Sequence, residues 1–184
     1  MEKIEKTYIV YPVRDGSKPF ILYPKNTHID WVLFDEFTKG IRPMSDYVPI
    51  RIKVKHKAAL QYDFYHCSAT MGLLSEKAIS VLGEEMLENY RKIPVFINEK
   101  PYFALQIAKE TDCLDLEKSV YVAFDEPSKY ILSIAKAIFH FDKLNPNQWF
   151  SIPQINYIYC TERVAEKIKQ TDLVGFEFIF TSVE

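Results

Sequence analysis

The fold is decided by the stretch Ile155-Asn156-Tyr157-Ile158-Tyr159-Cys160-Thr161-Glu162-Arg163-Val164-Ala165-Glu166-Lys167-Ile168 and its continuation to Thr181. Its first six residues are rich in β-branched and aromatic side chains, which suit a half-buried strand. Thr161 then offers a side-chain oxygen to the free N–H groups of a helix start. Val164, Ala165 and Ile168 recur at the spacing of one buried helical face. The stretch therefore predicts a strand that runs directly into an amphipathic helix.

A second strand is predicted after this helix. Gly175 can end the helix in a left-handed conformation without a Cβ clash. Phe176, Phe178 and Phe180 then occupy every second position, which is the period of a strand that buries one face. We expect all three phenylalanines to face the core against the helix that begins at Thr161.

Three blocks of the sequence resemble one bacterial family. The C-terminal block contains Tyr159-Cys160-Thr161-Glu162-Arg163, an amphipathic helix, and Leu173-Val174-Gly175-Phe176-Glu177-Phe178. The middle block contains Tyr102-Phe103-Ala104-Leu105-Gln106 and Asp112-Cys113-Leu114-Asp115-Leu116-Glu117-Lys118-Ser119. The first block contains Asp63-Phe64 and Leu74-Ser75-Glu76-Lys77-Ala78. The order of these blocks is similar to that of immunity protein family eleven of polymorphic toxin systems, formerly catalogued as a domain of unknown function.

This resemblance implies a function in binding. Proteins of this kind are antitoxins of the bacterial cytoplasm that bind and neutralise a cognate toxin domain, and they need neither catalytic residues nor a cofactor. The blocks cover roughly residues 60–181, so residues 58–184 form the family-like portion and residues 1–57 match it only loosely.

Length and composition are those of an ordinary globular protein. A chain of 184 residues predicts a single domain over residues 1–184. Apolar residues make up 48% and charged residues 26%, which predicts a folded rather than a disordered chain. The aromatic share of 15% favours a core rich in β-sheet, because flat, bulky side chains pack well on a pleated surface.

Charge and cysteine content exclude several classes of protein. The net charge of −2 argues against direct nucleic-acid binding. No apolar run reaches the roughly 20 residues that span a bilayer, and we expect no secretory signal because the charged stretch at residues 1–6 has no apolar segment. Cys67, Cys113 and Cys160 are an odd and widely spaced set, which fits reduced thiols in the cytoplasm. We expect a cytoplasmic protein with no membrane partner, and no pattern in the sequence specifies an oligomeric state.

The remaining patterns predict an α+β fold with a largely antiparallel sheet. One main helix is expected at about 75–90, capped by Ser75, and the other at about 161–171. Strands are expected at the positions listed here: 8–11, 20–23, 50–54, 62–65, 93–97, 102–107, 120–124 and 130–141. The stretch 68–72 is expected to be a loop, and residues 26–48 fit a short helix or a strand equally well. Helices at two places, without regular strand–helix alternation, favour α+β over a parallel α/β fold.

The sequence contains no catalytic or metal-binding signature. It lacks glycine-rich phosphate loops, G-x-S-x-G, C-x-x-C and H-E-x-x-H, and we predict no metal or cofactor site. One alternative is a small cytosolic enzyme that uses Cys67 as a nucleophile or Asp112 and Asp115 as paired carboxylates. A buried structural cysteine is the commoner case, and nothing in the sequence splits the pKa values of the two carboxylates. The first hypothesis is therefore a non-enzymatic immunity protein.

The acidic middle of the chain gives the candidate binding residues. Residues 58–126 hold 6 basic and 12 acidic side chains, a net charge of −6, whereas residues 1–57 hold 11 basic and 7 acidic ones. We predict that the partner, a cognate toxin domain, contacts four acidic residues of this region: Glu110, Asp112, Asp115 and Glu117. Two other interpretations remain open at this point: a solvated acidic face, and a structural role for Asp115. The basic pattern of Arg51, Lys53, Lys55 and Lys57 predicts an exposed edge strand rather than a phosphate-binding track.

Overall fold

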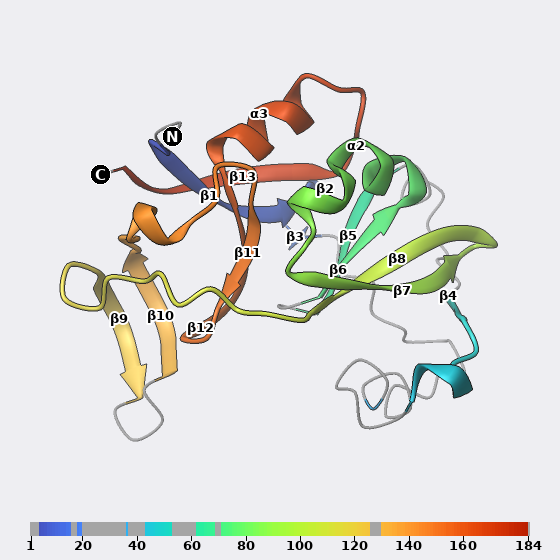
Figure 1. Cartoon of the computed structure of the whole chain (residues 1–184), viewed down its shortest axis with the longest axis horizontal. Coiled ribbons are helices and arrows are strands. Elements are labelled where there is room, and N and C mark those ends of the chain that lie inside the picture. Colours follow the sequence, from blue (N-terminus) through green and yellow to red (C-terminus); the bar gives the residue numbers. More distant parts are fainter. Residues whose placement is uncertain are drawn as a thin grey trace.

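Two large β-sheets, with the helices α2 and α3, make up most of the part of the chain that the structure describes (Figure 1). The structure, a computed structural model, describes residues 4–15, 18–19, 36, 43–52, 62–68, 71–125 and 130–183. The helices are α2 (Glu76–Met86) and α3 (Glu162–Lys169), and two short 3-10 turns are η1 (Met44–Asp46) and η3 (Phe141–Lys143). The fold is α+β with largely antiparallel sheets, which confirms the predicted class.

The first sheet has the strand order β11-β12-β1-β13, and all its neighbours are antiparallel. These strands are Trp149–Ile152 (β11), Ile155–Thr161 (β12), Lys6–Pro12 (β1) and Phe176–Val183 (β13). Helix α3 lies over this sheet, where it contacts β1 and β12 (Figure 1). The first described strand of the chain thus pairs with two strands from its last thirty residues.

The second sheet has the strand order β4-β7-β8-β6-β5. Its strands are Ile50–Ile52 (β4), Tyr90–Ile97 (β7), Lys100–Ile107 (β8), Met71–Ser75 (β6) and Phe64–Ser68 (β5). The pair β4–β7 is parallel and the other pairs are antiparallel. The turn between β7 and β8 consists of Asn98 and Glu99, whose φ angles of 45° and 64° are those of a tight hairpin turn. The hairpin predicted over 93–107 is confirmed.

Two smaller ribbons complete the described strands. Strands β9 (Val120–Asp125) and β10 (Tyr130–Lys136) form one, which extends from the body beside the first sheet (Figure 1). Strands β2 (Arg14–Asp15) and β3 (Lys18–Pro19) form the other. The strand expected at 20–23 lies outside the described residues, as do Lys53, Lys55 and Lys57. Arg51 is exposed in the edge strand β4, as the basic pattern predicted for it.

One apolar core is shared by both helices and both large sheets. Its largest fully buried side chains are Trp149 of β11 and Phe64 of β5. Helix α2 contributes Leu82 and helix α3 contributes Val164, both at most 2% exposed. The Phe64 ring stacks on the Phe176 ring of β13, with centroids 4.9 Å apart. Stacked and edge-on aromatic rings, rather than aliphatic side chains alone, therefore fill the space between the sheets.

The prediction for the three phenylalanines is wrong at one position. Phe176 and Phe178 are partly buried and pack against the shared core, but Phe180 is 52% exposed. The alternation of the strand is correct, so all three lie on the same face. Strand β13 is an edge strand, and the Lys169 Nζ at the end of α3 lies 5.4 Å from the centroid of the Phe178 ring, whereas Phe180 is half exposed. The pattern of a strand defines a face but does not define how far a helix reaches across that face.

Two predicted boundaries are also corrected. Helix α2 is interrupted by Gly83, whose φ is +77°, and it ends at Met86 rather than near residue 90, since Tyr90 already belongs to β7. The stretch expected to be a loop over 68–72 leads instead into strand β6. Gly72 lies inside that strand because a Cβ atom there would be 2.8 Å from the Phe64 ring. The glycine that suggested a loop is needed because the Phe64 ring leaves no room for a side chain at position 72.

A buried carboxylate joins the two sheets. Asp63 precedes β5, and its Oδ2 accepts a hydrogen bond from the Val174 N–H at 2.9 Å. Its Oδ1 accepts a bond from the Ser75 hydroxyl at 2.6 Å, and the Ser75 oxygen accepts the Ala78 N–H at 3.1 Å as the N-cap of α2. Backbone bonds link Asp63 to Val174 and to Ser75 as well, at 2.7 and 2.9 Å. One side chain thus fixes the start of α2 and the approach to β13 against β5.

Gly175 lets the chain pass close to this junction. Its φ is +102°, and an added Cβ would lie 2.8 Å from the Tyr62 Cβ and 2.9 Å from the Phe64 carbonyl oxygen. The sequence predicted Gly175 as the end of a helix, but α3 ends at Lys169. The glycine is needed instead at the entry to β13, where the backbone of the second sheet approaches.

We expect Phe64→Ala to lower the free energy of unfolding by about 3–5 kcal/mol, because it removes a fully buried ring from the shared core. Phe180→Ala is the matched control, and its half-exposed ring should contribute about 1 kcal/mol or less. Urea denaturation of the two variants measures both values. Equal losses would place Phe64 outside the core.

Asp63→Asn should destabilise the protein by about 1–3 kcal/mol, because the amide nitrogen turns one buried acceptor into a donor that faces another donor. Asp142→Asn is the control at an exposed position of η3. Thermal and urea unfolding would measure the difference. An Asp63→Asn variant as stable as Asp142→Asn would show that the junction does not hold the sheets.

Candidate functional site

The acidic segment lies between β8 and β9 and is anchored to the body at its centre. Cys113 and Leu114 are 0% and 4% exposed and belong to a second apolar core beneath β11 and β12. The Cys113 carbonyl accepts the His140 N–H at 2.7 Å, and Leu114 forms an isolated bridge with Phe139. The Thr111 N–H donates to the Ser151 carbonyl at 2.8 Å. The segment is therefore held by packing and by backbone bonds on both sides of Cys113.

Asp115 is part of this anchor rather than of the surface. Its Oδ1 accepts the N–H groups of Glu117 and Lys118 at 3.1 and 3.0 Å, and its Oδ2 lies 3.4 Å from the Lys118 Nζ. The backbone N–H of Lys118, more than any other group, lowers the pKa of this carboxyl below its usual range. The Asp115 carbonyl accepts the Ser119 N–H at 3.0 Å, and the Ser119 hydroxyl oxygen accepts the Ile138 N–H at 3.0 Å. The side chain of Asp115 thus shapes the turn that leads into β9.

The other three predicted residues, Glu110, Asp112 and Glu117, are exposed. Asp112 accepts a hydrogen bond from the Gln154 side chain at 3.0 Å, and its carbonyl accepts one from the Lys143 Nζ at 3.2 Å. Folding therefore brings a cation from further along the chain to the acidic segment. A charge count along the sequence missed it because Lys143 lies outside the counted region.

Strand β9 begins directly after this segment and exposes apolar side chains. Val120 is 52% exposed and Val122 is 69% exposed, and Leu116 in the preceding turn is 45% exposed. The Tyr121 hydroxyl donates to the Leu116 carbonyl at 2.5 Å, so the turn and the strand are tied together. Isolated exposed valines are common, but three apolar side chains beside exposed carboxylates resemble the mixed surface of a protein interface. The sequence analysis predicted β9 as a strand but did not identify this exposed face.

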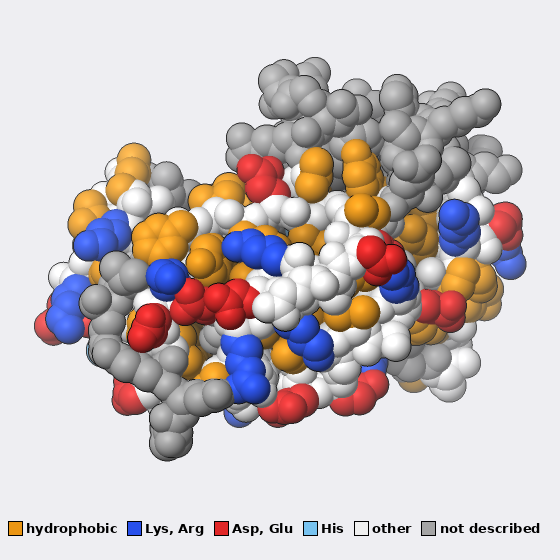
Figure 2. Space-filling model, turned by 90° about the horizontal axis from the view of Figure 1, so that it is seen from above, with side chains coloured by type: hydrophobic (Ala, Val, Ile, Leu, Met, Phe, Trp, Pro, Cys, Tyr) orange, Lys and Arg blue, Asp and Glu red, His pale blue; other side chains and the backbone are white. Residues whose placement is uncertain are grey.

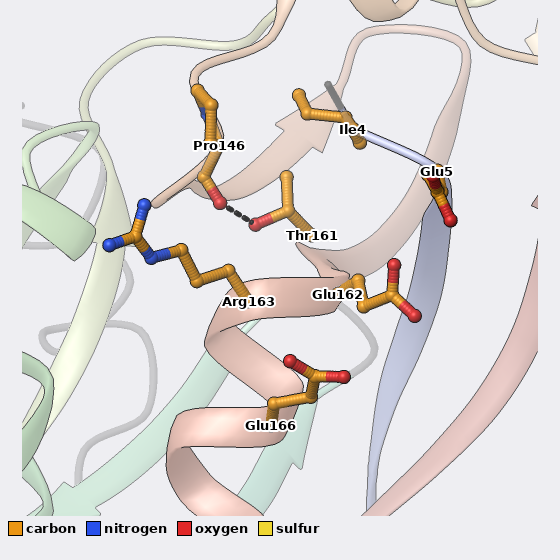
Figure 3. A pocket seen from close by; sticks show the side chains of 7 residues that line it. All are labelled: Ile4, Glu5, Pro146, Thr161, Glu162, Arg163 and Glu166. Atoms are coloured by element: carbon orange, nitrogen blue, oxygen red, sulfur yellow. Dashed lines mark hydrogen bonds between the residues drawn. The ribbon is translucent and has the colours of Figure 1, made fainter. Parts of the chain in front are cut away.

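A hollow of about 470 Å³ lies at the start of α3 (Figure 3). Glu5, Glu162, Arg163 and Glu166 are among the residues that line it, and the Arg163 side chain points away from those of Glu162 and Glu166. The Thr161 hydroxyl donates to the Pro146 carbonyl at 2.5 Å, so Thr161 is the N-cap residue but its side chain does not cap the helix as predicted. Glu162 also has a partner, since it pairs with Lys6 at 2.8 Å.

The face that carries α2 and α3 has acidic and basic side chains mixed together, so its electrostatic potential is not of one sign. Figure 2 shows red and blue side chains interspersed with apolar ones over this face. Opposite charges at close spacing cancel over a few ångströms in salt solution, so they attract no highly charged partner from a distance. The candidate binding surface is therefore the exposed acidic segment together with β9, rather than the face of the helices.

The described thiols are protonated and buried. Burial raises the pKa of Cys113 to about 12, and burial also raises the pKa of Cys160. A thiol in this state is a poor nucleophile near neutral pH. The side chain of Cys67, which the enzyme alternative uses, lies outside the described residues. The lowered pKa of Asp115 is opposite to the raised pKa that a general acid requires, so the geometry gives no support to an Asp112–Asp115 acid–base pair.

His66, the neighbour of Cys67, is held as a neutral side chain. It is 6% exposed and lies between the rings of Tyr11 and Phe64, with centroid distances of 5.8 and 5.0 Å. Burial lowers its pKa to about 4. An imidazole surrounded by aromatic rings has the environment of a core side chain.

The described part of the chain holds no group of three or more His, Cys, Asp or Glu side chains arranged for a metal ion. Nor does any described helix have the length and apolar character needed to cross a membrane. No protein-family model matches the chain, and no curated protein gives a significant match.

The buried His66 predicts a pH dependence of stability. Its pKa is about 6.5 when unfolded and about 4 when folded, so the unfolded state binds a proton first as the pH falls. Stability should fall between about pH 6.5 and 4, by up to roughly 3 kcal/mol, and this contribution should level off below pH 4. His66→Phe removes the titrating group. Urea denaturation at several pH values should therefore show the stability of the wild type falling more steeply than that of the variant, and parallel curves would contradict the buried state.

Proposed function

We propose that this chain is a non-enzymatic immunity protein that binds and neutralises a cognate toxin domain in the bacterial cytoplasm. The single observation that carries the proposal is an anchored segment in which the exposed carboxylates of Asp112 and Glu117 are followed along the chain by the exposed valines Val120 and Val122 of β9. A surface with apolar and charged groups on a fixed backbone suits the recognition of another protein. The resemblance to immunity protein family eleven supplies the class of partner.

The quoted sequence blocks also support this reading through their roles in the fold. The first and last blocks meet at Asp63, Ser75 and Val174, and the middle block forms the turn at Asp115 and Ser119. These residues stabilise the scaffold, which matches a family that shares a fold while each member recognises its own toxin. Under this proposal the specificity lies in the exposed side chains around the shared residues.

Co-expression tests the proposal directly. The toxin domain encoded by the adjacent upstream gene should arrest growth when it is expressed alone, and this protein should restore growth. Death at the same rate with and without a folded immunity protein would contradict the proposal.

We predict that Asp112→Asn combined with Glu117→Gln slows association with the toxin domain at low salt and leaves stability unchanged. Both carboxylates are exposed, and charges at the rim of an interface mainly raise the association rate. Asp115→Asn is the contrasting variant. It should destabilise the free protein, since its carboxylate holds two backbone N–H groups, without a special dependence on salt.

Stopped-flow association at two salt concentrations measures the first effect, and thermal unfolding measures the second. An association rate equal to that of the wild type at both salt concentrations would remove Asp112 and Glu117 from the interface.

A further inference from the structure

Three aromatic rings lie together on the face of the first sheet that α3 contacts. Tyr8 of β1 pairs directly with Phe180 of β13, and Val10 pairs with Phe178. The register of these strands shifts between Thr7 and Tyr8 and is regular from Tyr8 onward, so the three aromatic side chains share one regular face. The Tyr8 ring meets the Phe178 and Phe180 rings edge-on, with centroids 6.2 and 6.1 Å apart. Tyr8, Phe178 and Phe180 therefore form one continuous aromatic surface.

The protein already places a cation of its own on this aromatic surface. The Lys169 Nζ lies 5.1 Å from the centroid of the Tyr8 ring and 5.4 Å from that of the Phe178 ring. An ammonium at such distances is attracted by the negative faces of aromatic rings. No described Lys or Arg lies over the Phe180 ring in this way, and Phe180 is 52% exposed. Two of the three rings thus hold a cation, and the third is accessible to a cation from another molecule.

Helix α3 supplies a carboxylate on the side that faces β1. Glu162, Glu166 and Lys169 follow one another at spacings of four and three residues, so they lie along one side of the helix. Figure 3 shows Glu162 and Glu166 pointing to the side where β1 runs. Glu162 is paired with Lys6, whereas no described residue makes an ion pair or a hydrogen bond with the exposed carboxylate of Glu166. Glu166 is therefore left to pair with a group from outside the chain.

The pKa of Tyr8 shows that these carboxylates act on the aromatic surface. Burial raises the pKa of the Tyr8 hydroxyl, and the negative charges of Glu162 and Glu166 raise it further because they disfavour a phenolate. Lys6 opposes this effect, but its charge is already matched by that of Glu162. A negative potential that disfavours a phenolate favours a cation at the same place.

The combination of an exposed ring and an exposed carboxylate indicates which side chain fits here. An apolar side chain would cover the Phe180 ring, but it would also take Glu166 out of water without a partner, which is unfavourable. The guanidinium of an arginine is planar, stacks on aromatic faces and binds a carboxylate through two parallel N–H groups. Arginine is also enriched among the residues that contribute most to protein–protein affinity.

We propose that Phe180 and Glu166 form a binding site for an arginine side chain of the toxin domain, whose guanidinium stacks on the Phe180 ring and pairs with the Glu166 carboxylate. This inference rests on the proposed function and adds a second contact to the surface around Asp112 and Glu117. The contact acts at close range, so it needs no potential of a single sign over the face of the helices. It also accounts for an exposed ring in a strand whose Phe176 and Phe178 pack against the core.

The test measures binding of the full chain to the toxin domain encoded by the adjacent gene. Phe180→Leu keeps an apolar side chain but removes the ring, and Glu166→Gln keeps the size of the side chain but removes its charge. We expect each variant to raise the Kd about fivefold to tenfold. If one arginine contacts both side chains, the double variant should raise the Kd by less than the product of the two single effects.

Two matched controls change similar side chains elsewhere on the surface. Val48→Ala alters an apolar side chain that is 79% exposed and distant from β13 (Figure 1). Glu88→Gln removes the charge of an exposed glutamate just after α2. Each control should change the Kd by less than about twofold, since most exposed side chains outside an interface contribute little to affinity.

The outcomes separate this inference from the proposed function. Failure of the wild-type protein to bind the toxin domain overturns both together. Binding by Phe180→Leu and Glu166→Gln that is as strong as binding by the controls overturns the arginine site alone. A double variant whose effect equals the product of the single effects overturns a shared arginine. A wild-type dimer that both single variants convert to a monomer would assign the aromatic surface to a second copy of this chain instead.

Discussion

The carboxylate of Asp63 is the interaction on which the relative position of the two sheets depends. It binds a hydroxyl from the start of α2 and an N–H group from the approach to β13, and its own backbone pairs with the same two residues. The three segments that meet there belong to different sheets and are separated by long stretches of sequence. Because the site is buried, each lost hydrogen bond would leave a polar group without a partner, which is more unfavourable than the bond itself is favourable. The aromatic core between the sheets is positioned by this polar junction.

The sequence predicted the elements of the fold better than their extent. Strand period and helix capping gave the α+β class, the β7–β8 hairpin and the start of α2 at Ser75, since these depend on local backbone geometry. The errors occur where a distant partner decides the structure. Gly72 lies in a strand where the Phe64 ring leaves no room for a Cβ atom, and Phe180 is half exposed although Phe178 on the same face packs against the core. Neither neighbour can be inferred from the adjacent residues.

In the candidate site too, the sequence predicted local features correctly and missed those that depend on distant residues. Counting charges identified the acidic segment, but it could not separate Asp115, which is turned toward backbone N–H groups, from Asp112 and Glu117, which face solvent. It also missed Lys143, which the fold brings to the Asp112 carbonyl. The pattern Asp-x-Glu-Lys at residues 115–118 did carry a signal, because an aspartate followed by free N–H groups two and three residues later is typical of a side-chain-stabilised turn. The exposed valines of β9 had no such signal, since an apolar strand in the sequence is ordinarily read as a buried one.

The position of β1 has a consequence for the order in which the molecule forms. Strand β1 lies between β12 and β13, so both of its neighbours in the sheet are synthesised more than a hundred residues after it. The Thr7 hydroxyl bonds to that of Thr181 across 174 positions of the chain. During translation β1 therefore has neither of its neighbouring strands available. The sheet β11-β12-β1-β13 can form completely only after β13 has left the ribosome. Contacts of such high sequence separation slow folding, and an unpaired apolar strand can pair incorrectly with other chains until its partners are synthesised. The β7–β8 hairpin, whose strands are joined by two residues, can form before β12 and β13 are synthesised. The second sheet should therefore assemble first, and the first sheet should pack against it once β13 is available.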